Sequence, residues 1–185
     1  MAGASTPTRY SFNAQIYHWL TVILVVGAWT LGIVGDDLPR GPIRHYGETI
    51  HVACGEAVLF LLVLRLALRV VPPAPVAEAY PHSLAIYAAK IVHLSLYALL
   101  FAVPAAGILT LFYGGEPLAI FGMHDIPSPW LKNRELKHYA LEIHELFANL
   151  LLFLAGLHAV AALIHHYVLK DSALKRMLPE TWIKD

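Results

Sequence analysis

The last apolar stretch of the chain, residues 141–169, is long enough to cross a lipid bilayer and carries His144, His158 and His165. Ionisable side chains are costly in hydrocarbon and are kept there mainly where they bind something. Because His144 and His158 are 14 residues apart, close to four helical turns, their imidazoles share one helix face and lie roughly 21 Å apart along the axis. The pattern therefore predicts one histidine near each membrane surface, both facing the interior of a helix bundle.

Three further apolar runs have the length of about 20 residues that a membrane-spanning helix needs. They lie at approximately residues 14–34, 48–71 and 84–113. The chain of 185 residues is 58% hydrophobic and only 14% charged, which is far more apolar than an average soluble domain. We therefore predict an all-α fold: an integral membrane four-helix bundle that forms a single domain over residues 1–185. Segments rich in glycine and proline should end the first three helices.

Lysine and arginine predict the orientation of the bundle, because cytoplasmic loops carry an excess of both. With both termini inside, the inner side holds eight of them: Arg9, Arg65, Arg69, Lys90, Lys170, Lys175, Arg176 and Lys184. The outer side holds five: Arg40, Arg44, Lys132, Arg134 and Lys137. This excess favours a multi-pass protein with both termini in the cytoplasm. The formal net charge of zero argues against a nucleic-acid partner, since no basic excess is present to bind phosphates.

The histidines can be paired by their depth in the membrane. His18 lies near the cytoplasmic start of the first helix and His51 near the outer start of the second. Depth therefore pairs His51 with His144, and His18 with His158. Haem iron accepts axial imidazoles, and the facing helices of a bundle commonly hold cofactors. The pattern predicts two haems in the bundle core, stacked as an electron path across the membrane.

Other interpretations of these histidines remain open. They could hydrogen-bond one another or backbone carbonyls, or they could bind zinc, copper or nickel, although each pair supplies only two ligands. The single cysteine, Cys54, excludes an intramolecular disulfide and a thiolate metal cage. The chain has no Cys-x-x-Cys-His motif to attach a haem covalently. Gly55 and Gly156, which are close in sequence to His51 and His158, would let a flat ring approach the backbone.

Several short segments resemble the bacterial cytochrome b561 family, and the resemblance runs over nearly the whole chain, from about residue 10 to residue 179. They are IYHWL at residues 16–20, IHVACG at 50–55, VHL at 92–94, HE at 144–145, GLHA at 156–159 and HHY at 165–167. The resemblance implies a four-helix, di-haem protein of the bacterial inner membrane that acts as a superoxide:ubiquinone oxidoreductase. It carries the haem-ligand roles onto His18, His51, His144 and His158. Two haem b groups would be the cofactors and ubiquinone a substrate.

Other residues fit the same picture. Arg65 is 14 residues beyond His51, so it shares the haem-facing side at the cytoplasmic level and could hold a haem propionate. Arg69 lies one turn further on. Either arginine could instead snorkel from a helix end to the membrane surface.

Three histidines are candidates for the quinone site. His165 is seven residues beyond His158, which places it on the ligand face and roughly 10 Å nearer the cytoplasm. It could hydrogen-bond a quinone carbonyl and relay protons. His166 and His93 are lesser candidates, because His166 is rotated away and His93 has no remaining partner at its depth. All three could also be ordinary interfacial histidines.

The outer cations Arg40, Arg44, Lys132, Arg134 and Lys137 could form a positive funnel that steers superoxide. They could equally form a solvated surface or contact lipid headgroups. We predict that superoxide is oxidised to oxygen at the outer face, that electrons pass from the outer to the inner haem, and that ubiquinone is reduced near the inner face. Alternatives are an electron-transfer subunit docked to a partner dehydrogenase or hydrogenase, a haem-free helical protein, and quinol oxidation in the reverse direction.

Overall fold

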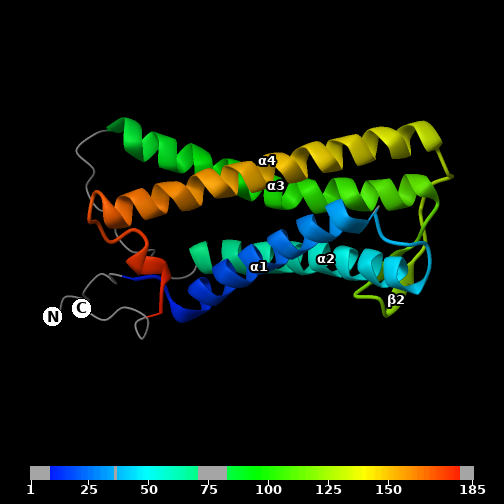
Figure 1. Ribbon diagram of the computed structural model, residues 1–185, viewed down its shortest axis with the longest axis horizontal. Helices are drawn as coiled ribbons and strands as arrows, with labels where there is room; N and C mark the ends of the chain where they lie inside the picture. The colour runs from blue at the N-terminus through cyan, green and yellow to red at the C-terminus, as the bar shows by residue number, and fades with distance from the viewer. Residues whose placement is uncertain (1–8, 36, 71–82, 180–185) are drawn as a thin grey trace.

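Four long helices form the body of the protein in the computed structural model, which describes residues 9–35, 37–70 and 83–179. They are α1 (Phe12–Gly35), α2 (Pro42–Val70), α3 (Ser83–Gly114) and α4 (Arg134–Tyr167). Each is long and apolar enough to cross a membrane, and the four run side by side along one axis (Figure 1). This arrangement confirms the predicted membrane four-helix bundle.

The helices pack as two pairs, α1 on α2 and α3 on α4, and the pairs meet through α2 and α3. The buried core lies at that junction, where Val58 and Leu62 of α2 meet Leu99, Leu100 and Leu151 of α3 and α4. Many other large apolar side chains are exposed, which suits a surface covered by lipid because lipid tails are as apolar as leucine. By contrast, α1 and α4 touch at few points. The bundle is therefore loosely packed on the side between them.

Local sequence signals explain where the helices end. Helix α3 stops at Gly114, and Gly115 follows with a positive φ of 74°, a conformation that glycine adopts without strain. Helix α4 begins at Arg134, before the apolar run, because the Asn133 side chain accepts hydrogen bonds from the N–H groups of Glu135 and Leu136. The proline-rich break expected near residues 72–75 lies outside the described residues.

A small antiparallel hairpin, which the sequence did not predict, lies between α3 and α4. Strand β1 (Leu118–Ile120) pairs with β2 (His124–Ile126). The Phe121 N–H at its turn donates to Glu56 Oε2 on α2 at 2.7 Å. This contact holds the loop between α3 and α4 against the bundle. We call this end of the bundle outer, after the orientation predicted from the sequence.

At the opposite end, the chain after α4 turns back onto the start of α1 (Figure 1). A short 3₁₀ helix, η1 (Lys175–Met177), follows this turn. The Trp19 indole donates to the carbonyl of Met177 at 2.8 Å, and the buried Gln15 amide donates to the carbonyl of Arg176 at 3.3 Å. Residues 176 and 177 are thus fastened to α1 at the other end of the bundle, which we call inner after the same predicted orientation.

Candidate functional site

The outer pair of histidines meets in the bundle interior. The ring centroids of His51, from α2, and His144, from α4, are 5.8 Å apart and the ring planes are inclined at 72°. His51 Nδ1 donates to the carbonyl of Ala28, and His144 Nδ1 donates to the carbonyl of Val103, both at 2.8 Å. Because a carbonyl only accepts, the proton lies on Nδ1, and Nε2 of each neutral ring keeps its lone pair. This is the tautomer by which histidine binds a metal through Nε2.

Two glycines make room for these rings. A Cβ at Gly32 would lie 3.3 Å from His51 Cε1, and a Cβ at Gly107 would lie 3.2 Å from both Cε1 and Nδ1 of His144. Gly32 lies four residues after Ala28, whose carbonyl accepts the hydrogen bond from His51. In the same way, Gly107 lies four residues after Val103, whose carbonyl accepts from His144. The carbonyl holds the imidazole and the glycine one turn later gives it space.

Sequence reasoning missed Gly32 and Gly107. It singled out Gly55, which lines the cleft beside the histidines, and Gly156, where an added Cβ would meet no atom of the described residues within 4 Å. No local signal distinguishes Gly32 from Gly27 on the same helix. The role of Gly32 depends on a ring that another helix brings to it.

A cleft adjoins the outer pair, and all four helices contribute to its walls. Its lining is apolar apart from the two histidines and the indole N–H of Trp29. That indole donates to Asn149 Oδ1 at 2.9 Å and so connects α1 to α4 where the two helices otherwise touch little. A slot with apolar walls and a few convergent polar groups is the usual form of a cofactor site.

The inner site gathers one polar side chain from each helix: His18 of α1, Arg65 of α2, His93 of α3 and His158 of α4. Arg65 Nη2 donates to His18 Nδ1 at 3.3 Å, and both His93 and His158 lie within electrostatic range of His18. The centroids of His93 and His158 are 5.2 Å apart. Sequence reasoning left His93 with no remaining partner at its depth, and the structure places it beside His158, the residue that depth paired with His18.

The two inner arginines share the face of one aromatic ring. The guanidinium carbons of Arg65 and Arg69 lie 5.4 Å and 5.6 Å from the centroid of Tyr97. Arg65 is half-buried and reaches His18, whereas Arg69 is exposed and has no such contact among the described residues. Arg65 therefore points into the bundle at the inner site.

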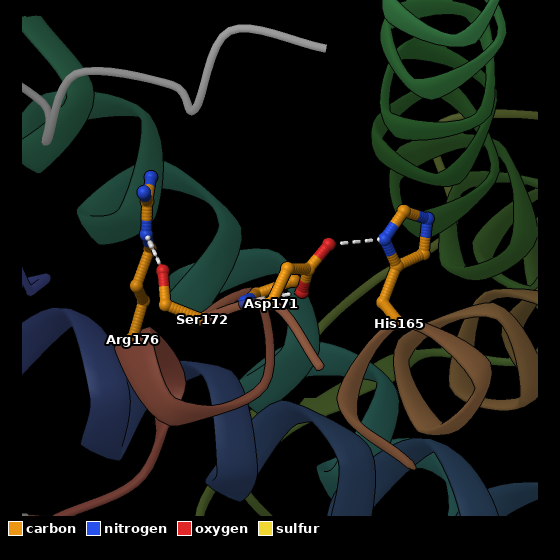
Figure 2. Close-up of polar contacts among 5 residues, drawn as sticks. His165, Asp171, Ser172 and Arg176 are labelled. Carbon is orange, nitrogen blue, oxygen red and sulfur yellow. Dashed lines mark hydrogen bonds and ion pairs between the residues drawn. The ribbon is translucent and has the colours of Figure 1, made fainter. Parts of the chain in front are cut away.

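The histidines near the end of α4 have different surroundings. His165 Nδ1 contacts Asp171 Oδ2 at 2.5 Å, across the turn that ends the helix (Figure 2). His166 stacks edge-on against Tyr167, and its buried Nδ1 has no hydrogen-bond partner among the described residues. Sequence reasoning missed Asp171, because only the turn after α4 brings it back to His165.

The five outer cations are not equivalent. Arg44 pairs with Glu48, and Lys137 pairs with Glu116, each at 2.9 Å. Arg40, Lys132 and Arg134 are exposed. Two members of the predicted funnel are thus offset by carboxylates, and the other three keep their charge at the surface.

Known proteins resemble this chain over almost its whole length. Residues 9–180 match the family model described as prokaryotic cytochrome b561. The chain is 36% identical over 172 residues to the protein named "Probable superoxide oxidase CybB" of Yersinia pestis, covering 93% of this chain and 97% of that one. It is 33% identical over 181 residues to "Cytochrome b561 homolog 2" of Escherichia coli (strain K12), covering 96% and 95%. It is 32% identical over 169 residues to "Cytochrome b562" of Cereibacter sphaeroides, covering 87% and 89%.

Proposed function

The chain belongs to the prokaryotic cytochrome b561 family, and from this premise we propose that it is a di-haem b-type cytochrome with superoxide:ubiquinone oxidoreductase activity. Membership makes it a multi-pass membrane cytochrome with b-type haem. The observation that carries the proposal is the outer histidine pair, in which two imidazoles from different helices keep Nε2 free to bind a metal beside one apolar cleft. Bound haem would supply reversible one-electron transfer at its iron.

In the proposal, His51 and His144 would hold the haem iron at the outer level. Their ring centroids are 5.8 Å apart, and both rings line the same apolar cleft. The ring nitrogens also suit metal binding, because each ring already donates its Nδ1 proton to a backbone carbonyl and keeps Nε2 as the donor atom for a metal.

His18 and His158 are the proposed ligands at the inner level, and His93 is the competing partner of His158. Two features favour His18. The centroids of His93 and His158 are 5.2 Å apart on helices that pack tightly together, which leaves little room for a flat ring between them. Helices α1 and α4, which carry His18 and His158, touch little and can admit a flat ring between them.

Arg65 would change partner when the inner site is filled. A guanidinium is always a donor, so its contact with His18 Nδ1 requires that nitrogen to accept and leaves the ring proton on Nε2. Ligation through Nε2 requires the other tautomer. A haem propionate would offer Arg65 a stronger, charge-assisted acceptor and release His18 Nδ1 to donate elsewhere.

The substrates follow from the two ends of the bundle. Exposed Arg40, Lys132 and Arg134 attract a small anion to the outer face, and a relative with 36% identity is named a probable superoxide oxidase. The excess of lysine and arginine that the sequence predicts on the other side supports an orientation with both termini in the cytoplasm. Ubiquinone would be reduced at that inner face, where His165 can reach a carbonyl oxygen.

A second candidate function is electron transfer for a partner dehydrogenase or hydrogenase docked at the outer face. Exposed apolar side chains on the outer loop favour it, since Met123 and Leu131 are 82% and 93% exposed and such residues are typical of binding surfaces. In that case the chain alone in detergent would not oxidise superoxide.

The deciding experiment exposes the purified, haem-loaded protein in detergent to superoxide and follows haem reduction in the spectrum, then adds decylubiquinone and measures quinol formation. The proposal expects both reactions. It expects His144→Ala to lose the outer haem and the superoxide-driven reduction. A wild-type protein with two haems that superoxide does not reduce would overturn the proposed activity and favour the docked subunit, while an unchanged spectrum in His144→Ala would overturn the ligand assignment.

A further inference from the structure

A carboxylate is built into the turn that ends α4. Asp171 Oδ2 contacts His165 Nδ1, while Asp171 Oδ1 accepts the N–H of Ala173 at 2.9 Å. The N–H of Asp171 in turn donates to the carbonyl of His165 at 3.0 Å. Three contacts thus hold Asp171 against the last turn of the helix. Figure 2 shows Nδ1 of His165 facing Asp171 and the second ring nitrogen on the opposite side of the ring.

This turn has a fixed place in the bundle. Arg176 Nε donates to Ser172 Oγ at 2.8 Å across it. Just beyond, the carbonyls of Arg176 and Met177 accept hydrogen bonds from Gln15 and Trp19 of α1. The orientation of His165 is therefore tied through Asp171 to the first helix, which carries the inner histidine His18.

We propose that Asp171 is a positioning residue for proton delivery to the quinone: its carboxylate accepts the Nδ1 proton of His165 and so directs Nε2 of that ring toward the carbonyl oxygen of a bound ubiquinone. This inference rests on the proposed function, which puts quinone reduction at the inner face. His165 lies seven residues beyond His158, roughly 10 Å further along the helix axis, so it can approach a substrate close to the inner haem without binding the iron.

The charge of Asp171 supports this role. Burial would raise the pKa of this carboxyl group, but the hydrogen bond from the Ala173 N–H and the neighbouring His165 and Arg176 outweigh burial and hold the pKa below its usual value. The group is therefore a carboxylate at neutral pH. A carboxylate beside an imidazole fixes which ring nitrogen points away from it, as second partners of functional histidines do.

The reaction balances in electrons and protons. Two superoxide ions each lose one electron and become two O₂, and the two electrons reduce one ubiquinone. One proton leaves His165 Nε2 as an O–H bond forms on the quinone oxygen that Nε2 faces, and the ring then regains a proton from water at the inner face. The second proton reaches the other quinone oxygen from water at the same face. Asp171 stays ionised throughout and acts only through His165.

The test compares Asp171→Asn with Ser172→Ala in the haem-loaded protein. Asparagine keeps an oxygen for the Ala173 N–H and hence the turn, but it removes the negative charge. Ser172→Ala removes the bond to Arg176 in the same turn and leaves the contact between His165 and Asp171 in place. Each variant is measured from about pH 6 to 8.5, a range that brackets ordinary histidine titration. The three measurements are haem content, superoxide-driven haem reduction without quinone, and steady-state reduction of decylubiquinone.

We expect Asp171→Asn to keep both haems and normal reduction by superoxide, but to lower kcat for decylubiquinone by about tenfold or more with a smaller change in KM. Among the described residues, Asp171 contacts the His165 ring and Arg176 lies beyond it. The loss of rate should appear in kcat because the change acts through the orientation of His165, which neither haem content nor superoxide-driven haem reduction reports. Ser172→Ala should match the wild type.

Two results would overturn the inference: equal kcat and pH profile in Asp171→Asn and Ser172→Ala, or loss of haem in Asp171→Asn, which would make the carboxylate structural. Failure of the proposed function is seen separately, as a wild-type protein that superoxide does not reduce. In that case, haem reduction by decylubiquinol still reports on the quinone site, and Asp171→Asn should slow this haem reduction.

Discussion

A methyl group at Gly107 should disturb the outer haem site more than any change of similar size elsewhere in the bundle. The new Cβ would lie 3.2 Å from both Cε1 and Nδ1 of His144, whereas unstrained carbon contacts are about 3.5 to 4.0 Å long. Either the ring or helix α3 must move by a few tenths of an ångström. The hydrogen bond of 2.8 Å from His144 Nδ1 to the Val103 carbonyl would be lengthened or bent by that movement.

The expected size of this effect follows from the packing. Adding a methyl group to a close-packed site costs about 1–3 kcal/mol, and each 1.4 kcal/mol is about a tenfold change in an equilibrium constant. If the haem-bound state bears this cost, Gly107→Ala should bind the outer haem about 5- to 150-fold more weakly. Replacement of a helical glycine by alanine otherwise stabilises a helix by up to about 1 kcal/mol, so backbone effects alone predict the opposite direction.

The assay measures haem content by the pyridine haemochrome method and midpoint potentials by redox titration, on protein purified in detergent. Gly27→Ala is the matched control, because no atom of the described residues lies within 4 Å of that Cβ position. We expect Gly27→Ala to keep both haems with wild-type potentials. If Gly107→Ala has the same haem content and potentials as Gly27→Ala, His144 does not sit against Gly107 in the functional protein and the reasoning is refuted.

Three further perturbations test other parts of the proposed mechanism. His18→Ala should lose the inner haem and His93→Ala should keep both, as read by haemochrome content, and the reverse result would make His93 the ligand. Lys132→Glu should slow superoxide-driven haem reduction severalfold at low ionic strength, with a difference that shrinks as salt screens the charge; a difference independent of salt in stopped-flow measurements would contradict steering. Trp29→Phe should remove the hydrogen bond to Asn149, lower the stability of the folded protein by about 1 kcal/mol and lower the temperature at which haem is released by a few degrees. An unchanged release temperature would show that this bond does not hold α1 to α4.

The number and nature of the helices could be predicted because the bilayer imposes the length and composition of each span. The constant rise of a helix was also enough to assign His51 and His144 to the same depth. Lateral placement was harder, since periodicity says how deep a side chain lies but not which helix is its neighbour. That is why His93 was left without a partner, although it lies beside His158.

The features that sequence reasoning missed depend on contacts between segments far apart in the chain. Gly32 and Gly107 matter only because α2 and α4 bring imidazoles onto them. Asp171 reaches His165 through a turn that no apolar pattern indicates. The hairpin strands have three residues each, too few to show the alternation by which a strand is recognised.

Two histidine pairs that each hold one haem b are the centre of the proposed mechanism. The most direct measurement is the pyridine haemochrome content of the purified, detergent-solubilised wild-type protein, expressed per chain. We predict two b haems for each polypeptide. One haem, or none, would contradict this mechanism, because at least one of the two pairs would then be structural and no electron path would cross the bundle.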